Sequence, residues 1–132
     1  MSALAMCLVE IDSRLTEQEM DEEMLRKASF LARLGSGSAS RSVYPGMALW
    51  GETASWKKSS DEYAIPVEDI HASFRDTRDA ILIIESGSKE VSSTLGHSLM
   101  EGNPFAATRF VQAEDHMQKI KPIIRDGDWN AF

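Results

Sequence analysis

The chain has 132 residues, of which 42% are apolar and 27% charged, and its formal net charge is −7. These proportions are typical of one globular domain, and the acidic balance excludes a nucleic-acid-binding protein because no basic stripe offsets it. A single cysteine excludes an internal disulfide framework, and no apolar run approaches the ~18 residues of a membrane span, so we expect a cytoplasmic protein without nucleic-acid or membrane partners.

Two helices are predicted before residue 36. The first has apolar residues at helical spacing, at Leu4, Leu8, Ile11 and Leu15. Thr16-Glu17-Gln18-Glu19 has the form of a capping box, so Thr16 is the expected N-cap of the second helix. The apolar stripe of that helix consists of Met20, Met24, Ala28 and Leu31. We expect it to stop at Gly35.

A stretch rich in glycine and serine, GSGSASRSVYPG, follows at residues 35–46. Gly35 and Gly37 can adopt positive φ and leave their N–H groups open to a ligand. The serine hydroxyls and the Arg41 guanidinium are donors suited to a carboxylate or a phosphate. A short helix is expected to begin near Ser38, and an anion is favoured at such a helix start. By composition alone the stretch fits a plain helix–helix connection equally well.

The rest of the chain alternates short strands with helices, which predicts an α+β fold. Strands are expected at about 46–52 and at 63–67, with Pro66 at an edge or a strand end. The aliphatic run 81–84 predicts a strand buried on both faces. Ser92-Ser93-Thr94 reads as a helix start, and Asn103-Pro104 opens a further helix with Asn103 as N-cap.

Two blocks of sequence resemble the diphosphomevalonate decarboxylases of the GHMP kinase superfamily. GSGSASRSVYPGMALW resembles the family's loop and the strand after it, and ILIIES followed by KEVSSTLG resembles a second family block. The resemblance implies part of a two-lobe GHMP-kinase-like fold. Residues 1–70 would be the end of the N-terminal lobe with the Gly/Ser loop, residues 71–79 a linker, and residues 80–132 the start of the C-terminal lobe.

The resemblance also implies an activity and a set of binding residues. Enzymes of this family use ATP and Mg²⁺ to convert 5-diphosphomevalonate to isopentenyl diphosphate in isoprenoid biosynthesis. Arg41 would bind the substrate carboxylate, and the loop and the later hydroxyls would hold the rest of the substrate. The substrate-binding residues implied are Ser36, Gly37, Ser38, Arg41, Ser92, Ser93 and Thr94.

The family's catalytic Asp and its ATP phosphate loop have no counterpart in these residues. We therefore assign no catalytic or metal-binding residue to the chain and expect it to be an inactive middle fragment of a longer enzyme. It would expose apolar surface along Leu4 and Leu8 and along 81–84, and would pair with itself or with the missing parts of its own chain. Two other hypotheses remain open: a GHMP-family kinase that does not decarboxylate, and a truncated binding or dimerisation module without catalysis.

Overall fold

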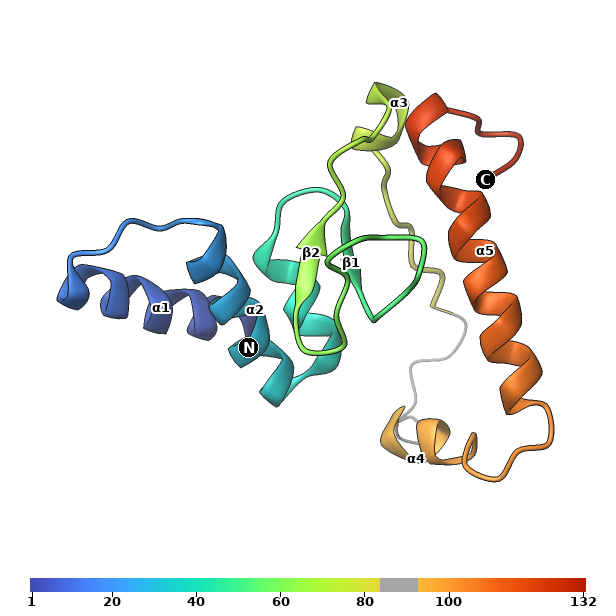
Figure 1. Cartoon of the computed structure of the whole chain (residues 1–132), viewed down its shortest axis with the longest axis horizontal. Helices are drawn as coiled ribbons and strands as arrows, with labels where there is room; N and C mark the ends of the chain where they lie inside the picture. The colour runs from blue at the N-terminus through green and yellow to red at the C-terminus, as the bar shows by residue number, and fades with distance from the viewer. Residues whose placement is uncertain (84–92) are drawn as a thin grey trace.

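The computed structural model describes residues 1–83 and 93–132, without the side chains of Ser93 and Thr94. Its elements are α1 (Ser2–Thr16), α2 (Glu22–Gly35), the 3₁₀ helix η1 (Gly37–Val43), β1 (Ala48–Trp50), β2 (Ala64–Pro66), α3 (Ala72–Arg75), α4 (Ser93–Ser98) and α5 (Ala106–Asp126). Figure 1 shows the α1–α2 hairpin at one end of the molecule, the two strands in the middle and α5 at the other end. Helices around one small sheet agree with the predicted α+β class.

The turn between α1 and α2 differs from the predicted capping box. Thr16 is the last residue of α1, and its hydroxyl donates to the Asp12 carbonyl at 2.8 Å. Asp21 is the N-cap of α2 and accepts the Met24 N–H at 2.9 Å. The assignment of Thr16 as N-cap is therefore wrong. A Thr hydroxyl can bond back to the preceding helical turn, whereas a carboxylate at position 21 also compensates the positive end of the α2 dipole.

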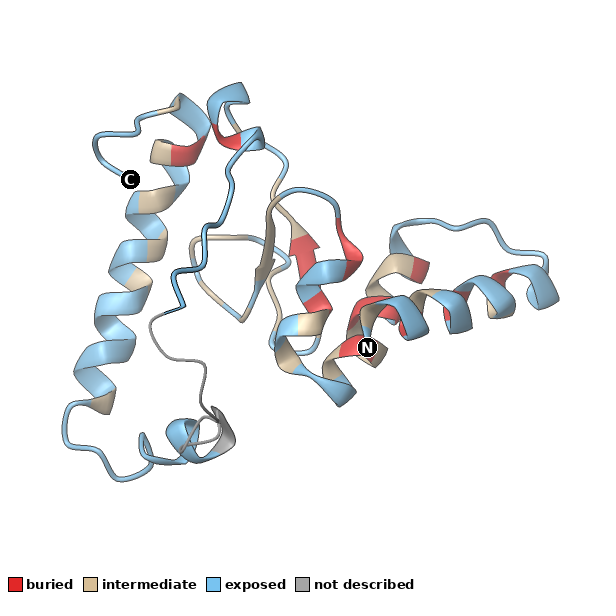
Figure 2. Cartoon of the chain, turned by 180° about the vertical axis from the view of Figure 1, so that it is seen from behind, coloured by how far each residue is buried: buried red, intermediate tan, exposed pale blue. Residues whose placement is uncertain are grey.

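The main core lies where α1, α2 and η1 meet (Figure 2). Small residues make the helix–helix contact: Ala5 and Val9 of α1, and Ala28 and Ala32 of α2, are all buried. The larger residues of α1 face away from this contact. Leu4, Leu8, Ile11 and Leu15 are between 52% and 80% exposed. The expected apolar surface along Leu4 and Leu8 is thereby confirmed.

The sheet is one antiparallel pair in which Leu49 lies opposite Ile65. Both strands fall within the predicted ranges, and β2 ends at Pro66, where a missing N–H costs no ladder hydrogen bond. The long connection between β1 and β2 contacts α5. There Glu114 accepts hydrogen bonds from Thr53 at 2.7 and 2.8 Å and from Ser55 at 3.0 Å.

The predicted strand at 81–84 is wrong for the three residues that the structure describes. Residues 81–83 have no regular structure, and each is at least 73% exposed. An aliphatic run becomes a central strand only when strands flank it and layers cover both faces. Among the described residues, the only strand pair is β1 with β2. Ile84 lies outside the described residues.

The long C-terminal helix is confirmed, but its first residues are not. Asn103 accepts the Phe105 N–H at 2.9 Å and forms a turn before the helix, and Phe105 is the N-cap of α5. The other end of α5 is closed by Gly127 in the left-handed conformation. Beyond it, Trp129 stacks on Phe74 of α3 with ring centroids 4.2 Å apart. This contact forms a second, smaller apolar cluster.

Candidate functional site

The Gly/Ser loop folds as η1, a helix with three residues per turn. At this period, residues three apart lie on the same face. Ser40 and Val43 are buried, whereas Ser38 and Arg41 are exposed. The 3₁₀ geometry therefore sorts the loop into an anchoring face and a face that presents a hydroxyl and a guanidinium together.

Ser29 of α2 fixes the anchoring face of η1. Its fully buried hydroxyl donates to the Ser40 carbonyl at 2.9 Å and accepts the Ala64 N–H of β2 at 2.8 Å. The Ser40 hydroxyl donates to the Gly37 carbonyl at 2.7 Å. Ser40 is thus a structural residue of the loop. Sequence reasoning missed the role of Ser29, although a serine beside alanine on the apolar stripe of a helix was a usable signal.

Position 37 requires a glycine because the fold leaves no room for a Cβ there, and not because of the backbone angles. Within the described residues, the glycines with positive φ include Gly46, in the turn after η1, but neither Gly35 nor Gly37. A Cβ at Gly37 would lie 2.5 Å from Cη2 of Trp50, whose Nε1 donates to the Asp61 carbonyl at 2.9 Å. Neither Gly35 nor Gly37 therefore uses the positive φ that is open to a glycine. The Trp50 indole packs directly on the loop at Gly37.

The exposed face of the loop carries an unpaired guanidinium and a pair of hydroxyls. The Arg41 guanidinium makes no hydrogen bond or ion pair within residues 1–83 and 93–132. The hydroxyls of Ser36 and Ser38 are hydrogen-bonded to each other at 3.3 Å, and both residues are exposed. No Asp or Glu occurs between Glu23 and Glu52, so no carboxylate lies close to Arg41 along the sequence. The arrangement is suited to an anionic ligand with more than one oxygen.

The second predicted block does not join this loop in the structure. Ser93 and Thr94 begin α4, as expected of a helix start, and Ser92 lies outside the described residues. Figure 1 shows α4 well separated from the strands beside η1. The structure therefore gathers Ser36, Gly37, Ser38 and Arg41 on one loop, and the later hydroxyls lie outside the described side chains.

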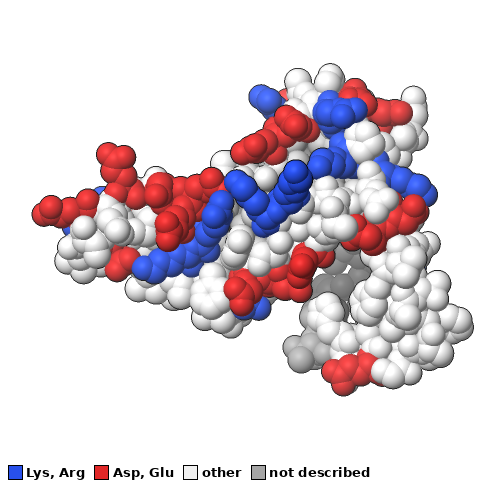
Figure 3. Space-filling view, in the orientation of Figure 1, with Lys and Arg blue, Asp and Glu red and all other residues white. Residues whose placement is uncertain are grey.

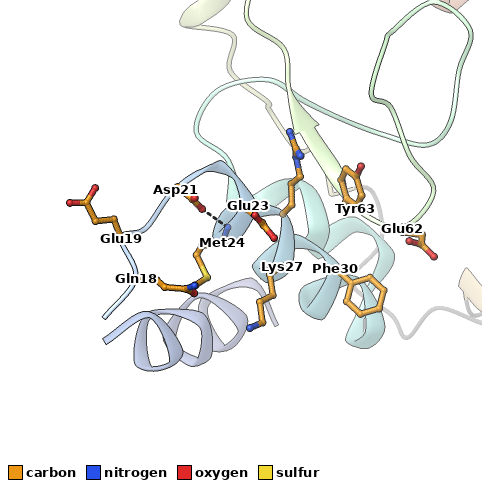
Figure 4. Close-up of a pocket in the computed structure, with 10 residues that line it drawn as sticks. Gln18, Glu19, Asp21, Glu23, Met24, Lys27, Phe30, Glu62 and Tyr63 are labelled. Carbon is orange, nitrogen blue, oxygen red and sulfur yellow. Dashed lines mark hydrogen bonds between the residues drawn. The ribbon is translucent and has the colours of Figure 1, made fainter. Parts of the chain in front are cut away.

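Two surface cavities of the described structure contain no residue of the Gly/Ser loop. One, of about 640 Å³, lies along α2 and the turn before it (Figure 4). Four carboxylates line it, at Glu19, Asp21, Glu23 and Glu62. Its two cations both have partners, because Arg26 pairs with Glu22 and Lys27 pairs with Asp12. This balance disfavours an anionic ligand there.

The other cavity, of about 590 Å³, lies between the β1–β2 connection and α5. Lys57, Lys58, Lys121 and Arg125 line it together with three acidic residues. Figure 3 shows Lys and Arg forming a band across this face of the molecule. Lys121 already donates to the Ser55 carbonyl at 2.9 Å and lies over the Trp56 ring. Its ammonium therefore serves to hold α5 against the connection.

The described residues contain neither a metal-binding cluster nor a membrane-spanning helix. Within residues 1–83 and 93–132, no group of three or more His, Cys, Asp or Glu side chains could hold a metal ion. No helix in the same part of the chain is long and apolar enough to cross a membrane.

Comparison with known proteins tests the resemblance read from the two blocks. Residues 1–64 match the diphosphomevalonate decarboxylase-like N-terminal domain. This part of the chain, just under half of its length, is therefore similar to that domain. The match includes the whole of the Gly/Ser loop, so the family resemblance stated from the sequence is confirmed.

Two curated relatives carry the same name. The chain is 32% identical over 109 residues to the diphosphomevalonate decarboxylase of Schizosaccharomyces pombe, covering 79% of this chain and 26% of that protein. It is 38% identical over 68 residues to the diphosphomevalonate decarboxylase of Eremothecium gossypii, covering 52% of this chain and 17% of that protein. The chain thus spans about a quarter of the length of the first relative. No solved structure matches the chain significantly.

Proposed function

We propose that this chain is the substrate-holding part of an ATP-dependent diphosphomevalonate decarboxylase, acting on 5-diphosphomevalonate in isoprenoid biosynthesis. One observation carries the proposal. The Arg41 guanidinium, without a partner in the described part of the chain, shares the exposed face of η1 with the Ser38 hydroxyl, inside the residues that match the decarboxylase-like domain.

The proposed reaction has two stages. The tertiary 3-hydroxyl of the substrate attacks the γ-phosphorus of ATP, loses its proton and displaces ADP. The new phosphate then leaves C3 while the bond between the carboxylate carbon and C2 breaks. The electron pair of that bond forms the new double bond, and CO₂ and isopentenyl diphosphate are released. A substrate with a carboxylate at one end and a diphosphate at the other needs an anion-binding group for each.

The loop offers both groups at one surface. The planar fork of Arg41 would bind both carboxylate oxygens, which fixes the direction of the bond that breaks. The hydroxyls of Ser36 and Ser38 would donate to phosphoryl oxygens. Gly37 would keep Trp50 packed close behind them. Ser92, Ser93 and Thr94 are proposed as further substrate contacts because KEVSSTLG resembles the second block of the family.

The described part of the chain contains no group of three or more side chains that could ligate Mg²⁺. We assign no residue of this chain to the binding of Mg²⁺ or ATP, and none as the general base of the proposed reaction. The expected behaviour of the 132-residue chain is therefore binding of substrate without turnover when ATP and Mg²⁺ are added.

Isothermal titration of the chain tests the role of Arg41. Arg41→Ala and Arg41→Lys should each weaken diphosphomevalonate binding by about 10- to 150-fold, because a charged hydrogen-bond partner contributes ~1.5–3 kcal/mol. Isopentenyl diphosphate has no carboxylate, so its Kd should be unchanged in both variants. An equal loss for both ligands, or no loss for either, contradicts the assignment. Arg75→Ala, at the exposed end of α3, is the matched control.

A further inference from the structure

Trp50, the last residue of β1, has an indole ring that is fixed at both ends although it lies at the surface. At one end, Nε1 donates to the Asp61 carbonyl at 2.9 Å. At the other end, Cη2 and Cζ3 lie 2.5 and 2.9 Å from the position that a Cβ on Gly37 would take. The residue is 37% exposed. Its ring is therefore held by these two contacts more than by burial in the core.

The Asp61 side chain keeps the Asp61 carbonyl in place for this hydrogen bond. Its Oδ1 accepts the Glu52 N–H at 2.8 Å, two residues beyond Trp50. Between them, the Gly51 N–H donates to the Ser60 carbonyl at 3.0 Å. The end of β1 is thus joined to residues 60–61 by three hydrogen bonds, and the Asp61 carboxylate accepts one of them.

The edge of the Trp50 ring limits where the loop backbone can lie at Gly37, the first residue of η1. Ser36 and Ser38 flank this glycine, and their exposed hydroxyls are hydrogen-bonded to each other at 3.3 Å. A shift of the backbone at Gly37 would therefore move both hydroxyls. Groups that are already held in their bound arrangement bind more tightly, because less conformational entropy is lost on binding.

We propose that Trp50 and Asp61 are positioning residues for the phosphoryl-binding hydroxyls of the loop: Asp61 fixes the indole ring, and the ring holds the loop backbone. This role rests on the proposed function, in which Ser36 and Ser38 donate to phosphoryl oxygens. It predicts an effect different from that of Arg41. Trp50 and Asp61 act on the diphosphate end, which diphosphomevalonate and isopentenyl diphosphate share, whereas Arg41 acts on the carboxylate that only diphosphomevalonate carries.

Isothermal titration of the 132-residue chain with diphosphomevalonate and with isopentenyl diphosphate tests these roles. Asp61→Ala and Trp50→Phe should each raise the Kd of both ligands by the same factor, about three- to tenfold. Asp61→Asn should bind both ligands like the wild-type chain, because its amide oxygen still accepts the Glu52 N–H. It removes the same negative charge as Asp61→Ala, so the comparison isolates the hydrogen bond. Trp56→Phe, in the same connection but beside Lys121, is the matched control and should leave both Kd values unchanged.

Circular dichroism establishes that each variant folds, and if Trp50→Phe does not, the two Asp61 variants decide the outcome. Wild-type Kd values in Asp61→Ala, even with a lower urea midpoint, would make the contact purely structural and overturn the positioning role. Equal losses in Asp61→Asn and Asp61→Ala, or a loss for diphosphomevalonate alone, would also overturn it. In each of these cases the proposed function stands if Arg41→Ala still weakens diphosphomevalonate selectively. A wild-type chain that binds neither ligand contradicts the proposed function and the positioning role together.

Discussion

Ser29→Ala should destabilise the protein more than any substitution on the exposed face of the loop. The Ser29 hydroxyl joins α2 by hydrogen bonds to both η1 and β2, through the Ser40 carbonyl at 2.9 Å and the Ala64 N–H at 2.8 Å. Ser29, Ser40 and Ala64 are all fully buried. Water therefore cannot replace the missing hydroxyl without opening the packing around it.

The size of the effect follows from the two groups left behind. A buried backbone donor or acceptor without a partner costs ~1–3 kcal/mol, and alanine leaves one of each. Partial relaxation of η1 reduces the sum, so we expect a loss of about 2–4 kcal/mol in the free energy of unfolding. Ser38→Ala removes an exposed hydroxyl of the same loop, and its change should stay within ~0.5 kcal/mol.

Urea unfolding followed by circular dichroism at one protein concentration measures both variants. Hydrogen exchange supplies a second readout, because amides of residues 37–43 should lose protection in Ser29→Ala even where the helix α2 remains intact. If Ser29→Ala unfolds within ~0.5 kcal/mol of the wild-type chain, the two hydrogen bonds do not hold the loop and the reasoning is refuted.

Two further predictions concern packing and pH. Gly37→Ala should lower the free energy of unfolding by ~1–3 kcal/mol, because the added Cβ clashes with Trp50. The control is Gly96→Ala, which should be neutral or slightly stabilising because nothing lies within 4 Å of its Cβ. Equal urea midpoints for the two variants would contradict this prediction. The Thr53 hydroxyl holds the pKa of Glu114 below its ordinary value. A lowered folded-state pKa contributes stability that is present above the ordinary value and is lost as the pH falls through the folded value. Acid should therefore weaken the attachment of α5 below about pH 4. Thr53→Val should reduce that pH dependence, with the hydrogen bonds from Ser55 and the Ala54 backbone maintaining the remainder, as measured by urea unfolding from pH 3 to 6; an unchanged dependence would refute the role of Thr53.

The sequence by itself determined the features that depend on neighbours in the chain. The stop of α2 at Gly35, the short helix near Ser38 and the strand end at Pro66 were all predicted, because each rests on the local geometry of one residue type. The sequence also determined that no carboxylate lies close to Arg41 along the chain, since residues 24–51 contain no Asp or Glu. The family of the loop was read from its residues and confirmed by comparison.

Other features were decided only by the tertiary structure. Periodicity showed that α1 has an apolar face, but the smaller Ala5 and Val9 were buried in place of the leucines, because small side chains let α2 approach closely. The sequence shows a glycine at position 37, but only the folded loop shows that the Trp50 ring occupies the space that a Cβ would need. The sequence predicted Thr16 as the N-cap of α2, but α1 continues through Thr16 and Asp21 takes that position. Burial, close approach and the ends of these helices depend on which segments meet, and a pattern along one chain does not specify that.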